Sequence, residues 1–553
     1  MPSNAEAAAL LREIADLLDL TGERFKPEAY RRAARSVETL GEELAAVAGR
    51  GGLREVPGVG AAIEEKLGEY VATGRIDYLD RLRAEVPAGL VTLMRLPGIG
   101  PKTTRRFWTE LGVTGPEELA RAIEANRLAG LKGFGTRKID QLTAALRVSA
   151  AGPPPGRQPI EAVYATAVGL RETLRTTAPT EQVEVAGSFR RGRETVGDLD
   201  LLVTSSDAEK VFDVFSALPE IAEVRMRGGT KETVLLKGGL QVDLRVVAPE
   251  AFGAALQYFT GSKEHNVRLR SLARDRGLKI NEYGVFRGEE RVGGRTEEEV
   301  YERLGLAWIP PELREDHGEI DAARDRRLPT LFVAGDLRGD LHVHLPPGDA
   351  AAALRAVRAE AEAIGLRYLG VVVAAPGPGD ESVRLADEPR AAVRSAPEGR
   401  VRLLTAAEVT PATPPAEAEA LGVDYRIVRP GPGSGGARPV LPEGFEARLV
   451  AHVRGDGPSG RPWLDVAARL GAALEVGPGP DRIDSSFART ARAMELRLAV
   501  ATGVGAPDGA TTRAVAVGFA RRAGATKAEV ANAADDPLGT ARPKRGRRRP
   551  TGA

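Results

Sequence analysis

The chain has 553 residues, of which 42% are hydrophobic and 28% are charged, and its formal net charge is +1. This length predicts three or four domains with buried cores, and the near-neutral charge excludes polyanion binding through bulk charge alone. The lack of cysteine excludes disulfides, thiolate zinc sites and a cysteine nucleophile. The first residues do not read as a signal peptide, and no apolar run reaches the roughly 18 residues that span a bilayer. We therefore expect a soluble, cytoplasmic, monomeric protein without membrane contact.

Residues 1–150 are predicted to be helical, with helices over 29–46 and 61–72, and they carry three related glycine turns. The turns read Val56-Pro-Gly-Val-Gly60, Leu96-Pro-Gly-Ile-Gly100 and Leu131-Lys-Gly-Phe-Gly135. Two glycines one residue apart allow a tight turn whose backbone N–H groups cradle phosphate ahead of a helix. One such turn is also an ordinary connection between helices. Three of them favour helix-hairpin-helix binding to DNA through Gly58, Gly60, Gly98, Gly100, Gly133 and Gly135.

Beyond a proline- and glycine-rich linker at 151–159, the pattern changes to α/β. Short β-branched runs at 183–187, 198–203, 233–237 and 241–247 predict a sheet within residues 160–251. A helix-rich segment follows over 252–316, and a charged linker is expected over 317–335. Short strands near 341, 369 and 401 alternate with helices and predict a second α/β domain over 336–533. The basic segment 534–553 is predicted to be disordered and either keeps the protein soluble or contacts duplex DNA non-specifically.

Two carboxylates lie on one predicted strand, in Gly197-Asp-Leu-Asp-Leu-Leu-Val203. Asp198 and Asp200 are two residues apart, so both side chains project from the same face of that strand. With Asp243 from a neighbouring strand they can hold a pair of Mg²⁺ ions, and oxygen ligands accept Mn²⁺ as well. Upstream, Gly187-Ser188 opens a turn that could hold the phosphates of a nucleotide, with Arg191 neutralising them. Three metal-binding carboxylates beside a phosphate-binding turn are the groups that phosphoryl transfer needs. The alternative interpretation is that the two aspartates only form a solvated strand end, as an isolated D-x-D would.

Residues 1 to about 320 resemble the X family of DNA polymerases, within the nucleotidyltransferase superfamily. The resemblance rests on the run from Gly187 to Leu202, on Tyr258-Phe-Thr-Gly-Ser262 and on Lys279-Ile-Asn-Glu-Tyr283. It implies a multidomain α and α/β fold: a helix-hairpin-helix N-terminal region, a nucleotidyltransferase palm at 160–251 and a nucleotide-selecting thumb or fingers subdomain at 252–316. It also implies that Asp198, Asp200 and Asp243 bind metal and that Asp243 accepts the proton of the primer 3′-hydroxyl.

The same resemblance assigns the nucleotide contacts. It implies that Ser188 and Arg191 contact the triphosphate, that Tyr258, Phe259 and Gly261 sense the sugar, and that Asn266 and Arg270 contact the minor groove. Arg245 and Glu282 match a charge pair linked to subdomain closing. The expected function is template-directed filling of short gaps in DNA repair, with dNTP and gapped or primed DNA as substrates. The alternatives are a nucleotidyltransferase with a non-DNA acceptor and a gap-binding scaffold whose catalysis has lapsed.

The N-terminal region resembles the family's lyase domain, and Lys66 falls where the Schiff-base lysine sits. Lys26 and Tyr30 match flanking phosphate-binding positions. A lysine amine can attack the aldehyde of a 5′-deoxyribose phosphate and release it by β-elimination. However, the family's second lysine is replaced by Ala62, and acids surround Lys66, so a solvated helix lysine is the alternative.

The C-terminal stretch resembles the polymerase-and-histidinol-phosphatase (PHP) domain, a distorted α/β barrel attached to bacterial X-family polymerases. His342 and His344 are spaced for one strand face, and Glu408 and His452 also fit the metal-ligand pattern. The stretches at 371–375 and 501–505, where further ligands are expected, hold valine, alanine, threonine and glycine. We therefore expect a degenerate domain without nuclease activity, holding at most one metal ion.

Overall fold

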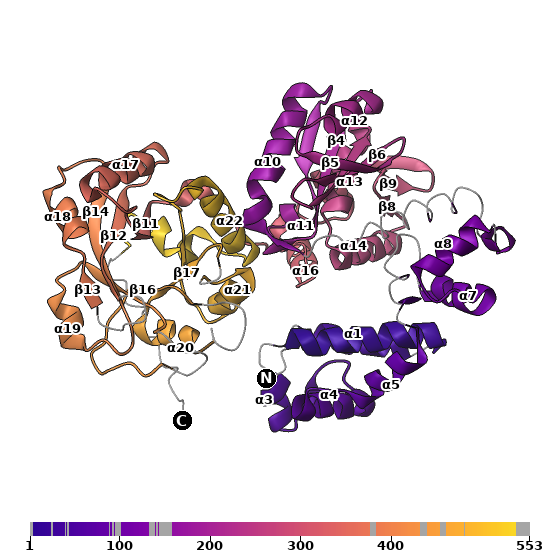
Figure 1. Ribbon diagram of the computed structural model, residues 1–553, viewed down its shortest axis with the longest axis horizontal. Coiled ribbons are helices and arrows are strands. Elements are labelled where there is room, and N and C mark those ends of the chain that lie inside the picture. The colour runs from indigo at the N-terminus through magenta and orange to yellow at the C-terminus, as the bar shows by residue number, and fades with distance from the viewer. Residues whose placement is uncertain are drawn as a thin grey trace. The chain divides into compact units, whose positions relative to one another are not determined.

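The computed structural model describes residues 4–23, 26–38, 40, 44–87, 89–90, 93, 101–125, 127–131, 139, 142, 157–376, 383–431, 439–453, 461–479 and 482–537. The chain forms two compact units, Met1–Pro154 and Pro155–Ala553 (Figure 1). Among the described helices, none combines the length and the apolar character that a membrane crossing requires.

The N-terminal unit is helical in its described part, as expected. Its elements are α1 (Asn4–Thr21), α2 (Lys26–Glu38), α3 (Leu44–Gly49), η1 (Leu53–Glu55), α4 (Ala61–Thr73), α5 (Asp77–Glu85), α7 (Pro101–Leu111), α8 (Pro116–Glu124) and η2 (Arg127–Gly130). Leu11, Ile14 and Leu18 of α1 pack on Ala33 and Val37 of α2. The single helix expected over 29–46 is wrong, because α2 ends at Glu38 and α3 begins at Leu44. The sequence places Gly41 between them, and glycine disfavours a continuous helix.

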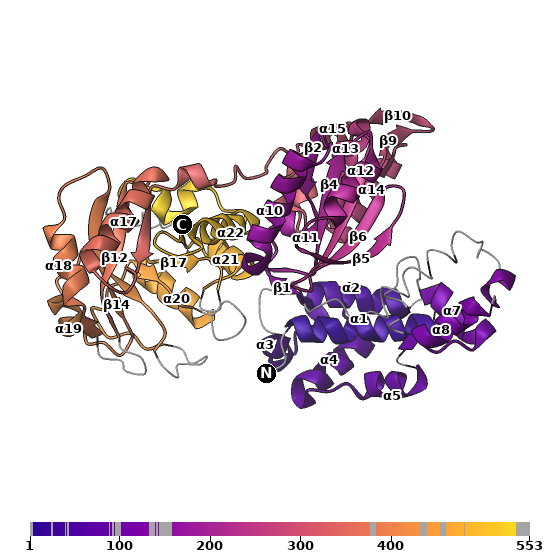
Figure 2. The same ribbon diagram turned by 45° about the horizontal axis from the view of Figure 1, so that its top comes forward.

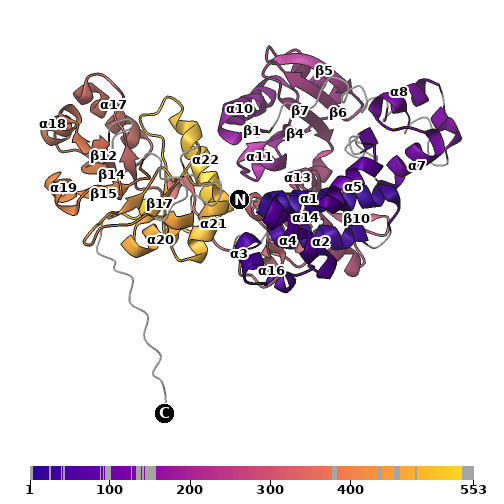
Figure 3. The same ribbon diagram turned by 60° about the horizontal axis from the view of Figure 1, so that its bottom comes forward.

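The region expected to be the palm contains a five-stranded sheet in the order β2-β4-β7-β6-β5, of which Figure 3 labels β4, β7, β6 and β5. Its elements are α10 (Ile160–Thr177), β2 (Gln182–Val185), α11 (Gly187–Arg190), β4 (Asp198–Thr204), α12 (Ala208–Ser216), β5 (Ile221–Arg227), β6 (Lys231–Leu236) and β7 (Gln241–Val247). Strand β1 (Gln158–Pro159) pairs with β3 (Thr195–Val196), so the fold begins within the segment expected to be a linker.

The two faces of this sheet have different cores because side chains alternate along a strand. Leu199, Leu201 and Val203 of β4 join the core that α10 and α12 cover. Leu202 points the other way, toward Phe252 and Leu256 of α13. Asp198, Asp200 and Leu202 are alternate residues of β4, so the two aspartates lie on the same sheet face as Leu202, the face covered by α13.

The next region combines helices with a three-stranded sheet. Its elements are η3 (Pro249–Ala251), α13 (Phe252–Thr260), α14 (Lys263–Asp275), β8 (Lys279–Asn281), β9 (Gly284–Arg287), β10 (Glu290–Gly293), α15 (Glu297–Arg303) and η4 (Pro311–Leu313). Where a linker was expected over 317–335, the structure has helix α16 (Glu319–Arg324). Ile320 and Ala323 of α16 pack into the same core as Leu269 and Val300. Apolar burial therefore fixes this segment.

The C-terminal domain is built on an eight-stranded sheet in which seven strands run parallel, in the order β11-β12-β14-β15-β16-β17-β18, with β13 paired antiparallel to β12. The strands are β11 (Gly339–Val343), β12 (Tyr368–Pro376), β13 (Val383–Leu385), β14 (Arg402–Val409), β15 (Tyr425–Val428), β16 (Leu449–Val450), β17 (Ala473–Val476) and β18 (Leu498–Val500). The helices are η5 (Ala334–Asp336), α17 (Ala350–Ala363), α18 (Asp387–Ser395), α19 (Pro415–Ala420), α20 (Arg461–Leu470), α21 (Ser485–Ala493), α22 (Gly509–Arg522), η6 (Lys527–Glu529) and η7 (Ala531–Ala533).

Side chains, rather than strand pairing, join the first and last strands of this barrel-like sheet. The Asn532 amide nitrogen donates to the carbonyl of Gly339 in β11 at 2.9 Å and to that of Val500 in β18 at 2.8 Å. Its amide oxygen accepts from the Val500 N–H at 2.9 Å. One buried side chain therefore takes the place of a closing strand pair.

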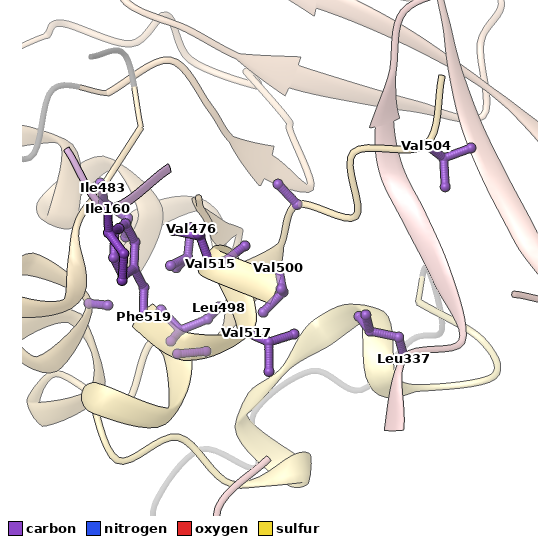
Figure 4. Packing of buried hydrophobic residues seen from close by; sticks show 14 of the residues in the cluster. Ile160, Leu337, Val476, Ile483, Leu498, Val500, Val504, Val515, Val517 and Phe519 are labelled. Carbon is purple, nitrogen blue, oxygen red and sulfur yellow. The ribbon is translucent and has the colours of Figure 1, made fainter. Parts of the chain in front are cut away.

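The palm region and the C-terminal domain share one hydrophobic core. Helices α10 and α22 lie side by side (Figure 2). Ile160, at the start of α10, lies with Ile483 and Phe519 of the C-terminal domain (Figure 4). Because this apolar contact is continuous, residues 157–537 form one packed body over their described part.

Candidate active site

The three aspartates come together through strand register. Strands β4 and β7 are parallel neighbours, and Asp200 pairs directly with Asp243. Asp198 lies two residues earlier on β4 and shares the face of Asp200. The register therefore places all three carboxylates at one end of the α13 face.

Mutual repulsion and burial act on these carboxylates. Burial, with Asp198 and Asp243 nearby, raises the pKa of Asp200 to about 7. Burial and Asp243 also raise the pKa of Asp198. The Asp243 carboxylate turns to Lys231, whose Nζ lies 2.5 Å from Oδ2, and it accepts a hydrogen bond from the Thr233 hydroxyl at 2.8 Å. Such a group of acids lowers its repulsion by binding cations.

The turn at Gly187 touches the aspartates directly. Gly187 has φ +64°, and a Cβ atom there would lie 2.5 Å from Oδ2 of Asp200. Glycine is therefore required both for the left-handed backbone and for the close approach. Ser188 follows Gly187 in the short helix α11 and is half-buried.

Arg191 is held by one edge of its guanidinium. Its Nε donates to Oε1 of Glu315 at 2.8 Å, and its Nη1 donates to the carbonyl of Thr260. A Cβ on Gly261 would lie 3.2 Å from that Nη1, so Gly261 packs against the same arginine. The structure thus connects two expected nucleotide contacts, Arg191 and Gly261, which are far apart in sequence.

Arg190, the neighbour of Arg191, connects the palm region to α15, which the sequence reasoning missed. Its guanidinium forms two hydrogen bonds with Glu297, at 2.7 and 2.9 Å. Buried Arg314 donates to the same carboxylate at 2.6 Å. Although burial opposes ionisation, Arg314 and Arg190 hold the pKa of Glu297 at about 2. The adjacent arginines Arg190 and Arg191 were the available signal, because guanidiniums that become mostly buried need acidic partners.

The expected sugar-sensing residues end helix α13. The rings of Tyr258 and Phe259 pack edge to face with centroids 5.1 Å apart. The Arg245 guanidinium lies 4.3 Å from the centroid of Phe259 and 3.9 Å from Asp243. Arg245 is therefore placed against the aspartates and Phe259, and no ion pair between it and Glu282 is seen among the described residues.

The two expected minor-groove residues lie on α14. Asn266 is buried, and its amide nitrogen donates to the carbonyl of Tyr258 at 2.7 Å while its amide oxygen accepts from Gln257 at 2.7 Å. Arg270 is exposed on the same helix. Asn266 thus supports the end of α13, and Arg270 is open to solvent.

The aspartates fit a divalent metal. Asp198, Asp200 and Asp243 offer only carboxylate oxygens, the ligands that Mg²⁺ prefers. Burial first, and the neighbouring aspartates second, raise the pKa of Asp198 and Asp200, and a bound cation would oppose both effects.

Comparison with known proteins agrees with this arrangement. The DNA polymerase beta palm model matches residues 157–240, and the DNA polymerase beta thumb model matches residues 255–315. A helix-hairpin-helix domain matches residues 2–76, and a SAM-like helix-hairpin-helix tandem matches residues 90–147. The chain is 35% identical over 367 residues to "DNA polymerase/3'-5' exonuclease PolX" of Bacillus subtilis, covering 66% of this chain and 63% of that protein. The chain belongs to the X family of DNA polymerases.

More distant X-family relatives match as well. Identity is 26% over 346 residues to DNA polymerase lambda of Rattus norvegicus, covering 56% of each chain. It is 23% over 346 residues to DNA polymerase lambda of Arabidopsis thaliana, covering 56% of this chain and 62% of the relative. The chain thus spans less than two thirds of the length of each of these relatives.

A second cluster in this X-family chain lies in the C-terminal domain. Nε2 atoms of His342, His344 and His452 lie 2.8, 2.8 and 3.1 Å from Oε1 of Glu408. The four ligand atoms lie within 4.8 Å of one another, and imidazole nitrogen with carboxylate oxygen suits a transition metal. The structure brings together all four residues that the sequence singled out in this domain.

Two further residues in this cluster were missed. Buried Glu475 lies 3.1 Å from Nδ1 of His342, and Arg429 donates to the second oxygen of Glu408 at 2.8 Å. Burial opposes a charged imidazole, but Glu475 and Glu408 raise the pKa of His342 to about 10. An acid inside the apolar strand 473–476 was the signal for Glu475, because such an acid needs a partner.

The carboxylate of Asp340, two residues before His342, is engaged in hydrogen bonds with backbone and with Thr502. It accepts hydrogen bonds from the N–H of His342 at 2.8 Å and from the N–H of Thr502 at 3.1 Å, and the Thr502 hydroxyl also donates to it. The residues at 371–373 are buried apolar side chains of β12. The stretches 371–375 and 501–505, where further ligands were expected, contain no histidine, aspartate or glutamate.

The lyase candidates lie in the N-terminal unit. Lys66 donates to the carbonyl of Ala62 at 3.0 Å, and its Nζ lies 4.7 Å from the ring centroid of Tyr78. Lys26 is exposed and pairs with Glu23 at 3.1 Å. Tyr30 is 5% exposed, and burial, followed by Tyr78, raises its pKa to about 12. Tyr30 therefore packs in the core of the N-terminal unit, and its expected phosphate contact stays a prediction.

The first glycine turn is described, whereas the other two are not. Gly58 has φ +85°, and a Cβ there would lie 3.0 Å from the Arg32 side chain, so this glycine allows close packing on α2. Gly60 precedes α4 and is exposed. Gly98, Gly100, Gly133 and Gly135, and the basic tail after residue 537, lie outside the described residues.

Proposed function

We propose that this chain is a DNA-directed DNA polymerase that fills short gaps during repair, transferring a nucleotide from dNTP to a primer 3′-hydroxyl. The observation that carries the proposal is the register of Asp200 with Asp243, together with the contact between Asp200 and the Gly187 turn. Both contacts support a metal site that adjoins a triphosphate site. The X-family relatives, named DNA polymerases, support the same activity.

Separate groups of residues bind the metal, the triphosphate, the sugar and the DNA in this proposal. Asp198, Asp200 and Asp243 would hold divalent metal, Mg²⁺ or Mn²⁺, which supplies charge stabilisation at the transferring phosphoryl group. Asp243 accepts the proton of the primer 3′-hydroxyl. Ser188 and Arg191 bind the triphosphate, and Tyr258, Phe259 and Gly261 shape the sugar site. Gapped DNA is held by the helix-hairpin-helix segments.

The two alternatives differ in their acceptor and in their catalysis. A nucleotidyltransferase with a small acceptor would not need the two helix-hairpin-helix segments that match residues 2–76 and 90–147. A lapsed scaffold would not need to retain all three aspartates on one face. Both features therefore favour a polymerase.

Primer extension on one-nucleotide-gapped DNA tests the proposal. Wild-type protein should insert one templated nucleotide, and Asp200→Asn and Asp243→Asn should each lower insertion by at least about 1,000-fold while binding gapped DNA normally. Asp213→Asn is the matched control, because Asp213 is a 68% exposed palm acid that pairs with Arg227. Extension by Asp243→Asn at the wild-type rate would refute the assignment.

For the C-terminal domain we propose a degenerate PHP fold without nuclease activity. The Bacillus subtilis relative is named a 3'-5' exonuclease, but its activity need not extend to this chain. Support comes from the ligand set, since three histidines converge on Glu408 whereas Asp340 is held by Thr502 and by backbone. Four ligands suffice for one metal ion and not for a multinuclear centre.

The remaining assignments are part of the same proposal. We propose the four domains expected at 1–150, 160–251, 252–316 and 336–533, with the second extended back to β1 and the third extended forward to α16. We also propose a monomer and a cytoplasmic location. Lyase activity at Lys66 stays a prediction. It is tested by borohydride trapping on 5′-deoxyribose phosphate DNA, which Lys66→Ala should abolish and Lys26→Ala should only weaken.

A further inference from the structure

The C-terminal domain reaches the candidate triphosphate site through buried charges. Arg522, the last residue of α22, donates from Nη1 to Oε1 of Glu315 at 2.7 Å. The same oxygen accepts the Nε–H of Arg191 at 2.8 Å. The side chains of Arg522 and Glu315 are 7% and 8% exposed. One carboxylate oxygen therefore connects an arginine of the C-terminal domain to an arginine of the palm region.

The charges in this group leave a positive surplus. Burial disfavours a charged Glu315, but Arg522 and Arg191 lower its pKa to about 2, so it is ionised at neutral pH. Its single negative charge is shared by two arginines at hydrogen-bond distance, with Arg193 3.7 Å from the other oxygen. Without Arg522, Glu315 would neutralise Arg191 more completely. Burial, together with Arg522 and Arg193, lowers the pKa of Arg191, and Glu315 opposes this shift. Arg522 therefore acts by engaging Glu315 and adding positive charge beside Arg191.

The geometry also leaves part of Arg191 available. A guanidinium carries five N–H donors. Nε is used by Glu315 and Nη1 by the Thr260 carbonyl, and within the described residues no protein partner is seen for Nη2. Two anchors fix the plane of the group while Nη2 can donate to a phosphate oxygen. An arginine fixed in this way loses little entropy when it binds an anion.

The backbone around Arg191 is held by the same domain. Nη1 of Arg522 lies 3.4 Å from the carbonyl oxygen of Arg191. A Cβ on Gly192 would lie 3.6 Å from the carbonyl oxygen of Gly518 in α22, and the Ser485 hydroxyl donates to Glu194. Helices α21 and α22 therefore support residues 191–194 from behind.

We propose that the C-terminal domain serves nucleotide addition itself, with Arg522 as a positioning residue that holds Glu315 and so keeps the Arg191 guanidinium oriented for the triphosphate of the incoming nucleotide. The proposal rests on the polymerase function proposed above. It gives the C-terminal domain a role that needs neither a metal nor a nuclease.

Steady-state kinetics on one-nucleotide-gapped DNA test this inference in the full-length protein. Arg522→Gln should raise the KM for dNTP about three- to tenfold with kcat within about twofold, because a charge-assisted contact is weakened and not removed. Arg522→Lys, which restores the charge, should recover most of the loss. Arg521→Gln is the matched control, because Arg521 pairs with Glu312 at 2.6 Å in the same interface without contacting Glu315.

A double-mutant cycle shows whether Arg522 acts through Arg191. In an Arg191→Ala background, Arg522→Gln should leave the KM for dNTP unchanged. Glu315→Asp keeps the charge but withdraws the carboxylate, and it should also raise KM, so it carries the test if Arg522→Gln does not fold. If the wild type does not extend primers, the proposed function is wrong and this inference falls with it. If the wild type extends and these variants keep its KM, or if Arg521→Gln matches Arg522→Gln, this inference alone is wrong.

Discussion

A Cβ atom on Gly187 would lie 2.5 Å from Oδ2 of Asp200, so the turn that opens α11 rests directly on a candidate metal-binding carboxylate. The turn follows β2, whose neighbour in the sheet is β4, and the backbone N–H of Ala186 donates to the carbonyl of Asp200 at 2.7 Å. The candidate triphosphate site and the candidate metal site are therefore in direct contact at Gly187 and Asp200.

We predict that Gly187→Ala lowers nucleotide insertion by about 100-fold or more, because the methyl group displaces Asp200 and φ +64° is unfavourable for alanine. Single-turnover insertion on gapped DNA measures the loss. Gly229→Ala is the control, since Gly229 lies in the same region and a Cβ there would meet nothing within 4 Å. Equal rates for both variants would mean that the contact has no catalytic consequence.

Glu232 makes the stability of the protein depend on pH. It is fully buried in β6, neither carboxylate oxygen has a hydrogen-bond partner among the described residues, and burial raises its pKa to about 7. An acid whose folded pKa lies above its unfolded value stabilises the protein below about pH 4.5 and loses that contribution as the pH rises to about 7.

We predict that Glu232→Gln raises the free energy of unfolding by about 1–2 kcal/mol at pH 8 and has little effect near pH 4.5. Thermal unfolding at the two pH values measures the difference. Glu223→Gln, at a 54% exposed position on the neighbouring strand, should change neither value. A gain for Glu232→Gln that is larger at low pH would contradict the assignment.

We predict that the purified protein does not degrade single-stranded DNA from its 3′ end, with Mg²⁺ or with Mn²⁺. Glu408 pairs with Arg429, and Asp340 is held by Thr502, so the cluster lacks the ligands to fix bridging metals. Degradation assays use wild type, Asp200→Ala and His342→Ala. Mn²⁺-stimulated degradation that persists in Asp200→Ala and disappears in His342→Ala would overturn the prediction.

We predict that Asn532→Ala destabilises the C-terminal domain by about 2–4 kcal/mol, because three hydrogen bonds between β11 and β18 are lost and their buried backbone groups are left unpaired. Chemical denaturation measures the loss of unfolding free energy, and hydrogen exchange of the β18 amides shows whether the loss lies at this strand. Asp535→Ala, which removes an exposed partner of Arg367 three residues later, should cost less than about 1 kcal/mol. Equal losses would argue against closure by Asn532.

Local patterns in the sequence determined much of the candidate site. The spacing of Asp198 and Asp200 fixed their common face because side chains alternate along any strand. Strands at 182–185, 198–204 and 241–247 follow from runs of β-branched and apolar residues. The histidine pair at 342 and 344, with Glu408 and His452, was recognisable from residue type and spacing, and the structure joins all four.

Contacts between distant segments were decided only by the tertiary structure. Nothing near Arg191 in sequence identifies Glu315 and Arg522 as its companions, and nothing near Asn532 shows that it joins the first and last strands of a sheet. Residues 317–335 read as a charged linker because burial of Ile320 and Ala323 depends on a core supplied by other helices. Local propensity sets the backbone of single elements, whereas ion pairing and apolar burial depend on which elements meet, and that depends on the packing of the whole chain.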